Sequence, residues 1–153
     1  MAKKNTIILL ERLLNQSRKD KLMYLNAAER QDLPAFKRFF NQQAIYRNSM
    51  FYDFSNLLTE HGIEVEDVIL KSPDIRQLMM TTLGRDKKNS FAECLSQDQL
   101  FKINLEELIQ VDLTEKNVLI YQKHLAKIDA SIEENDLFST EVSAKAFSTF
   151  GSL

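Results

Sequence analysis

The sequence contains very few of the residues that break or cross-link a chain. Its 153 residues include three glycines, two prolines and one cysteine. A single cysteine excludes an internal disulfide and a zinc site built on cysteine pairs, and Cys94 is expected to act as a small buried hydrophobe. So few turn-forming residues argue against a β-sandwich, which needs a turn after each short strand. Folding is therefore expected to depend on one hydrophobic core, which a chain of this length can build.

The sequence also lacks an excess of charge of one sign and any long apolar run. Lys and Arg number 20 against 22 Asp and Glu, which gives a net charge of −2. No basic stripe is present that would neutralise the phosphates of a nucleic acid. The apolar run Ile7–Leu10 is too short for a signal peptide or a membrane span. We therefore expect a cytoplasmic protein that binds neither nucleic acid nor a membrane.

What the sequence does have is helical periodicity. Apolar residues make up 44% of the chain and charged residues 27%, which is typical of long amphipathic helices. Apolar positions recur at intervals of three and four from Thr6 to Arg30, which predicts a first helix. Asp32 as N-cap and Pro34 in the first turn predict the start of a second helix, which Gly62 ends. The short connection makes these two helices antiparallel neighbours.

The second half of the chain predicts two further long helices. The segment Ser72-Pro73-Asp74 is a strong helix start, because it combines a cap, a proline and an acid in the first turn. Ser90 and Glu93 form a capping box that would restart this helix after a kink. A last long helix is expected over 103–128, although Asp112-Leu113-Thr114 would break it if a cap formed there.

The remaining segments are expected to be connectors or tail. Residues 63–70 are more compatible with a packed connector than with a strand, because an isolated strand would have no partner. Residues 131–153 are expected to form either a mobile tail or a short amphipathic helix that docks on a groove. The sequence thus predicts an all-α fold, with a four-helix bundle over residues 1–130 and a C-terminal tail over residues 131–153.

Polar residues interrupt the apolar faces of the predicted helices. We expect them to form a structural polar layer in the interior, made of Asp20, Tyr24, Gln43, Arg47 and Tyr121. A buried charge must be paired, and the guanidinium group presents a fork that matches a carboxylate. Arg47 is therefore expected to pair with Asp20 or Glu115 and to fix the register of the helices.

An alternative is that interior carboxylates gather a divalent metal. Asp112 and Glu115 are expected to share a face of the fourth helix, and together with Asp20 they would form an iron or manganese site. Glu29 or Glu107 would complete the ligand set. Arg47 argues against this alternative, because a cation in the same layer repels the metal.

The sequence does not contain the motifs of common catalytic sites. Di-iron bundles use Glu-x-x-His on two helices, but Leu58 and Tyr121 stand three residues before His61 and His124. No glycine-rich phosphate loop and no local nucleophile motif is present. Conventional hydrolase chemistry is therefore not expected.

Several segments carry a resemblance to a known family. They are Tyr24–Ala28, Leu33–Phe40, Gln43–Arg47 and Leu58–Gly62, with a fainter likeness in Leu105–Leu108 and Tyr121–Leu125. These segments resemble small bacterial ferritin-like four-helix-bundle proteins of uncharacterised function. The resemblance implies a ferritin-like, up-and-down four-helix bundle. Members of that family vary in whether they keep the metal-binding carboxylates.

Two functions follow from these expectations. The first is a non-catalytic, metal-free bundle that forms a homodimer through an apolar helix face and acts through a protein partner, for example in stress response. The C-terminal tail would contact that partner. The second is a di-metal protein that stores iron or manganese or activates oxygen through Asp20, Asp112 and Glu115. The interior position of Arg47 favours the first function.

Overall fold

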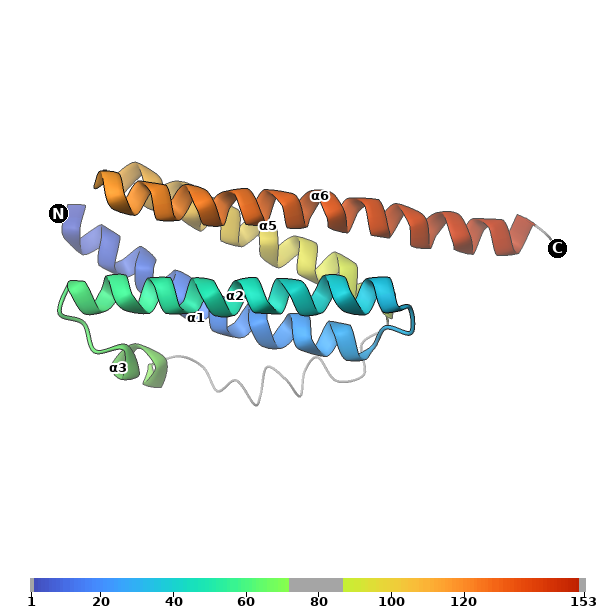
Figure 1. The fold of residues 1–153 in the computed structure, drawn as a ribbon, viewed down its shortest axis with the longest axis horizontal. Helices are drawn as coiled ribbons and strands as arrows, with labels where there is room; N and C mark the ends of the chain where they lie inside the picture. The colour runs from blue at the N-terminus through green and yellow to red at the C-terminus, as the bar shows by residue number, and fades with distance from the viewer. Residues whose placement is uncertain (1, 72–86, 152–153) are drawn as a thin grey trace.

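The protein is almost entirely helical (Figure 1). This computed structural model describes residues 2–71 and 87–151, and the side chains of residues 3–71 and 90–141. The helices in these ranges are α1 (Ala2–Glu29), α2 (Pro34–Glu60), α3 (Val65–Leu70), α5 (Lys87–Val111) and α6 (Glu115–Gly151). The same ranges contain no strand, and none of their helices has the length and hydropathy needed to cross a membrane. The all-α prediction is confirmed, whereas the helix start predicted at Ser72 lies outside the described residues.

The first two helices form the predicted hairpin. Leu33, rather than Asp32, is the N-cap of α2, with an extended backbone and no side-chain capping bond. The residue before a proline is restricted to extended conformations, so Pro34 forces Leu33 to stay outside the helix. Pro34 then occupies the first turn, where its missing N–H group costs little. The predicted N-cap is therefore wrong by one residue.

The end of α2 is closed by Gly62, as predicted. This residue has a φ angle of 78°, in the left-handed region that glycine adopts without strain. Its N–H group donates to the carbonyl of Thr59 at 2.9 Å, and the N–H group of Ile63 donates to the carbonyl of Leu58 at 3.0 Å. These two bonds define a Schellman motif. The chain then enters α3, whose Val68 is buried in the core, so this segment is a packed helical connector.

The next two long helices are divided differently from the prediction. Residues 112–114 separate α5 from α6, so the segment that begins at Ile103 belongs to the third long helix and not to the fourth. The carboxylate of Asp112 accepts a hydrogen bond from the N–H group of Thr114 at 3.2 Å, a local bond that competes with helix formation. Ser90 lies inside α5, which begins at Lys87, so Ser90 is not the cap of this helix; whether the helix restarts after a kink depends on residues before Lys87, which lie outside the described ranges.

The last helix, α6, is the longest. It has 37 residues, against 25 to 28 for the other three long helices. It runs through residue 130 without a break, and Ser131 and Asn135 beyond that point are buried. The boundary expected at residue 130 therefore does not coincide with a helix end. The final part of α6 extends past the hairpin of α1 and α2 (Figure 1), and the predicted docking helix is a continuation of α6.

The four long helices pack around one interior. α1 lies against both α2 and α5, and α6 lies against both α5 and α2, whereas the backbones of α2 and α5 make no close approach in the described residues, so these two helices meet only through side chains across the interior. α1 and α6 run in one direction, and α2 and α5 run in the other (Figure 1). The expected up-and-down order is wrong at one point, because α2 and α5 run the same way. Residues 61–86 give that connection enough chain to pass along the length of a bundle.

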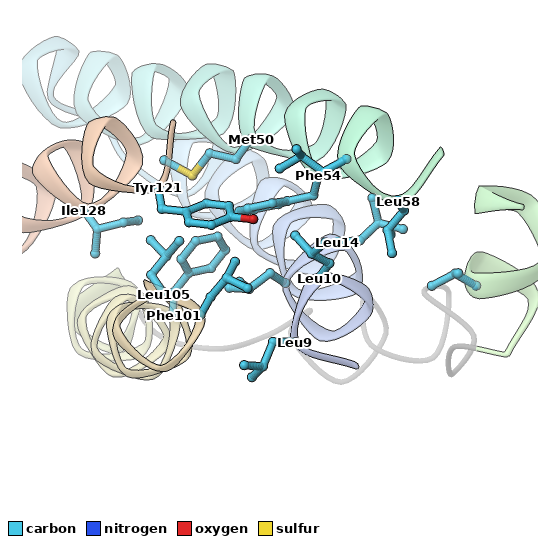
Figure 2. Close-up of a cluster of buried hydrophobic side chains, with 14 residues drawn as sticks. Leu9, Leu10, Leu14, Met50, Phe54, Leu58, Phe101, Leu105, Tyr121 and Ile128 are labelled. Atoms are coloured by element: carbon cyan, nitrogen blue, oxygen red, sulfur yellow. The ribbon is translucent and has the colours of Figure 1, made fainter. Parts of the chain in front are cut away.

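The buried side chains form two clusters at different heights along the helices. We call the first the leucine cluster; it includes Leu10, Leu14, Met50, Phe54, Leu58, Phe101, Leu105, Tyr121 and Ile128 (Figure 2). We call the second the phenylalanine cluster; it includes Ala28, Phe36, Phe39, Phe40, Phe91 and Cys94, with Phe138 packed against it. Its rings meet at angles typical of aromatic packing, as in the edge contact of Phe36 with Phe91 at 5.2 Å. Each cluster draws on all four long helices.

Candidate functional site

Five polar side chains meet in the interior where the two clusters adjoin. They are Asp20 and Tyr24 of α1, Arg47 of α2, Asp98 of α5 and Ser131 of α6, and we call them the polar layer. All five are 0% exposed. On each helix, leucine-cluster residues lie on one side of the layer and phenylalanine-cluster residues lie on the other. The layer is therefore closed to solvent along the helices as well as across them.

Asp98 is the centre of the hydrogen bonding in this layer. Its Oδ1 atom accepts a hydrogen bond from Nη2 of Arg47. Its Oδ2 atom accepts hydrogen bonds from the hydroxyls of Tyr24 at 2.6 Å and Ser131 at 2.8 Å. A buried carboxylate is stable only with such donors. One side chain of α5 is thus bonded to α1, α2 and α6, which fixes the height of each helix relative to the others.

The guanidinium group of Arg47 is enclosed by charge and by aromatic rings. Its Nε atom lies 3.6 Å from Oδ2 of Asp20, in addition to the contact of its Nη2 atom with Asp98. Its central carbon lies 5.3 Å from the ring centre of Tyr24 and 4.8 Å from that of Phe101. A planar, weakly hydrated cation suits these surroundings better than an ammonium group would. The pairing of Arg47 with Asp20 follows the faces predicted for α1 and α2.

Burial perturbs the ionisation of the layer. Burial raises the pKa of Asp20 to about 7, which Arg47 opposes and Asp98 reinforces. Burial also raises the pKa of Asp98, although the charge of Arg47 and the hydroxyls of Tyr24 and Ser131 oppose the rise. Burial alone would lower the pKa of Arg47, but Asp98, Tyr24 and Asp20 outweigh it and raise the value. Arg47 therefore stays charged, and Asp20 takes up or releases a proton near neutral pH.

Asp20 is the least satisfied member of the layer. Within the described residues neither of its carboxylate oxygens has a hydrogen-bond partner, because 3.6 Å to Arg47 is too long for a hydrogen bond. An unsatisfied buried carboxylate favours its neutral form, which agrees with the raised pKa. Gln43 lies one turn before Arg47 and is buried, but its Oε1 atom likewise has no partner among those residues. Gln43 therefore lies beside the polar layer without completing it.

Tyr121 belongs to a different site, at the junction of α5 and α6. Its hydroxyl donates to Oδ2 of Asp112 at 2.6 Å, and the amide of Asn117 donates to the same oxygen at 3.0 Å. Burial would raise the pKa of Asp112, but the donors from Tyr121, Asn117 and Thr114 hold it below its usual value. This carboxylate stabilises the start of α6, where the helix dipole favours negative charge. Tyr121 is about 15 Å from Ser131 along the helix axis, too far to join the polar layer.

The carboxylates predicted to hold a metal are not brought together. Asp20 lies in the polar layer, Asp112 lies at the helix junction, and Glu115 is exposed at the start of α6. Glu29 and Glu107 are also exposed. The described part of the chain contains no group of three or more His, Cys, Asp or Glu side chains placed to hold a metal ion. The prediction fails because it treats residues around Asp112 as helix, whereas the chain turns there.

Two further titratable side chains are buried. Nε2 of His124 lies 2.7 Å from a carboxylate oxygen of Asp53. Burial lowers the pKa of His124 although Asp53 opposes this effect, so the ring is mainly neutral at pH 7. Cys94 lies in the phenylalanine cluster, and burial raises the pKa of its thiol. A protonated, buried thiol is a poor nucleophile, which agrees with the expected packing role of Cys94.

Two members of the polar layer, Asp98 and Ser131, are not predicted from the sequence. A usable signal exists for Asp98, because it interrupts an apolar stripe with helical spacing: Phe91, Cys94, Asp98, Phe101, Leu105 and Leu108. That stripe becomes visible only once the third long helix is known to extend to residue 111. Ser131 falls in the segment expected to be tail. Both omissions therefore follow from the misplaced helix boundaries.

Comparison of the chain with protein-family models, with curated proteins and with solved structures finds no match. The likeness to ferritin-like bundles therefore stays a prediction from the sequence. What the chain does has to be inferred from the geometry of its interior and its surface.

Proposed function

We propose that this chain is a non-catalytic ferritin-like four-helix bundle that acts through a protein partner. The observation that carries the proposal is the contact of Arg47 with both Asp20 and Asp98. A metal held by these carboxylates would have to occupy the place of the guanidinium group. Arg47 already supplies the positive charge that they require, and it would repel a second cation. The polar layer is thus better suited to fixing helix register than to chemistry.

The helix connections support the ferritin-like part of the proposal. Two antiparallel pairs, α1 with α2 and α5 with α6, are joined by one long connection between helices that run in the same direction. Ferritin-like bundles differ from simple up-and-down bundles in having one long crossover connection of this kind. The observed order therefore favours the ferritin-like arrangement over other four-helix arrangements.

The length of α6 supports the partner part of the proposal. Its end extends past the hairpin of α1 and α2 (Figure 1). The sequence of this end includes Val142, Phe147 and Phe150, which are side chains that an interacting helix uses to fill a partner's groove. We propose that the partner binds this end of α6.

Metal analysis tests the non-catalytic part of the proposal. Protein purified without chelator is analysed for metals and then titrated with iron(II) and manganese(II) while its melting temperature is followed. We expect no stoichiometric metal and no change in melting temperature. Stoichiometric metal with a raised melting temperature would overturn the proposal, and loss of that rise in Asp98→Asn would place the metal in the polar layer.

Truncation tests the partner part. A chain that ends at Glu141 keeps Phe138 and the buried core, so we expect its circular dichroism and melting temperature to stay close to those of the full chain. Proteins captured from an extract by the full chain should be absent when the truncated chain is the bait. Equal capture by both chains would place the partner surface elsewhere.

A further inference from the structure

The outward side of α2 is marked by its lack of charge. All residues of α2 are described, and its exposed positions between Arg38 and Glu60 are Asn41, Gln42, Ile45, Ser49, Tyr52, Asn56 and Thr59. None of these seven side chains is charged, whereas more than half of the exposed positions of α6 from Glu115 to Glu141 are charged. Depletion of charge together with an exposed tyrosine is the composition of the central part of a protein interface.

Two large apolar side chains lie on this face of α2. Ile45 is 61% exposed and Tyr52 is 59% exposed. They are seven residues apart, so they lie on one line along the helix. The ring of Tyr52 contacts the ring of Phe51 edge-on at 5.7 Å, which restricts its motion. A hollow next to Ile45, lined also by Gln42 of α2 and Glu134 of α6, leaves room for a side chain from another molecule.

We infer that this face binds the same face of a second copy of the chain, with the two α2 helices antiparallel and the twofold axis close to Ser49. In this register Ile45 lies opposite Tyr52 of the second copy, at the hollow. Arg38 lies opposite Glu60 of the second copy. Such a contact is isologous, because each pair occurs twice about the axis. The small side chain of Ser49 permits the helices to approach closely at the centre.

The two charges that border the face determine its orientation. Arg38 and Glu60 of one chain are about 33 Å apart along α2, beyond the range of interaction of exposed charges in physiological salt. An antiparallel pair of α2 helices brings each of them to its opposite charge on the second copy. A parallel pair would place Arg38 against Arg38 and Glu60 against Glu60, which is unfavourable. Glu60 also contacts Lys116 at 3.6 Å, but both side chains are largely exposed and this pair contributes little.

This inference goes beyond the proposed function and does not depend on it. A bundle that held a metal, or one that bound its partner elsewhere, would pair through the same face. The outcome of the metal analysis and the outcome of the experiments below can therefore be judged separately.

Sedimentation velocity of matched variants tests the location of the contact. The unmodified chain should sediment as a dimer at high concentration and dissociate on dilution. Ile45→Asp should raise the dimer dissociation constant at least about tenfold. Ile103→Asp is the control, because Ile103 is also exposed, at 54%, and lies on α5, whose backbone makes no close approach to α2. A monomer at every concentration, or equal effects of the two variants, would overturn the inference.

Charge reversal tests the orientation of the two helices. Arg38→Glu and Glu60→Arg should each weaken the dimer, and the double variant should regain most of the lost affinity because each new pair is again of opposite sign. Circular dichroism of each variant shows whether the fold is kept. Additive weakening in the double variant would overturn the antiparallel register.

Cysteine cross-linking tests the position of the twofold axis. Under mild oxidation Ser49→Cys should form a disulfide-linked dimer, because the two copies of this position meet at the axis. Gln42→Cys alone should not form one, but mixed with Asn56→Cys it should give a cross-linked heterodimer. Cys94 is buried and should remain unmodified in all of these proteins. Self-cross-linking of Gln42→Cys, or none with Ser49→Cys, would overturn the proposed axis.

Discussion

Replacement of Arg47 by Met tests whether the polar layer determines the stability of the fold. Arg47 is fully buried, and its guanidinium group contacts the carboxylates of Asp20 and Asp98. Met is a long, flexible and uncharged side chain, so it replaces much of the volume and removes the cation. The substitution leaves Asp20 and Asp98 in the interior without an opposite charge.

The expected loss follows from what each carboxylate retains. Removing one partner of a buried ion pair costs about 3–5 kcal/mol. Asp20 has a pKa of about 7, so at neutral pH it can become neutral and contribute little to this cost. Asp98 keeps the hydroxyl donors of Tyr24 and Ser131, which limits its penalty. We therefore expect Arg47→Met to lower the free energy of unfolding by about 3 kcal/mol, near the lower end of that range.

Urea unfolding at pH 7, followed by far-UV circular dichroism, measures this loss. Lys123→Met is the matched control, because Lys123 is exposed on α6 and its replacement should change stability by less than about 0.5 kcal/mol. Adding Asp98→Asn to Arg47→Met should recover part of the loss, since it removes the buried charge left unpaired. A loss below about 1 kcal/mol for Arg47→Met would refute the reasoning, because a buried ion pair that stabilises the fold cannot be broken at so small a cost.

Three further predictions concern single contacts. The pKa of Asp20 rises on folding from 3.8 to about 7. Between these two pH values the folded chain therefore keeps a proton on Asp20 that the unfolded chain has released. The contribution of Asp20 to the free energy of unfolding consequently falls as pH rises from about 4 to about 7. Asp20→Asn should lack this fall. In urea titrations the free energy of unfolding of Asp20→Asn, relative to that of the unmodified chain, should therefore increase as pH rises over this range; parallel pH profiles of the two proteins would contradict this. Tyr121→Phe removes the 2.6 Å bond to Asp112 and should cost about 1–2 kcal/mol at pH 7 in the same assay, whereas no loss would mean that this bond does not stabilise the start of α6. Gly62→Ala should lower the free energy of unfolding by about 1 kcal/mol through backbone strain alone, because φ is 78° and an added Cβ meets no atom within 4 Å. Gly62→Asn should lower it less, as measured by thermal unfolding. An equal loss for the two variants would point to a side-chain clash.

The first half of the fold is accessible from the sequence because its signals are local. Pro34 and Gly62 mark the ends of α2 within a residue or two, and both act through backbone geometry that needs no tertiary contact. The short connection from α1 then leaves only an antiparallel arrangement. The faces of these helices also place Asp20 and Arg47 toward each other, and the structure has them in contact.

The second half of the fold is harder to predict from the sequence, because the contact that separates α5 from α6 depends on side chains of both helices. Asp112 ends α5 by bonding to Thr114, but its carboxylate is held in place by Tyr121 and Asn117. The apolar residues on both sides of Asp112 have helical spacing, so the sequence pattern alone predicts a continuous helix where the chain turns. Once the turn is missed, Asp98 is not recognised as the interior residue of its own helix, and the partner of Arg47 on α5 is lost from the prediction.

The contact between Arg47 and Asp98 also has a consequence for how the molecule can open. α2 and α5 lie on opposite corners of the bundle and make no close backbone approach in the described residues. They meet across the interior through side chains, namely aromatic rings such as Phe36 and Phe91 and the ion pair of Arg47 with Asp98. Asp98 also bonds to Tyr24 of the first helix pair, so the α1–α2 hairpin cannot move away from the α5–α6 pair without exposing a charged group. Amide protons at the centres of all four long helices should therefore exchange with solvent at similar rates, because the two hairpins open together.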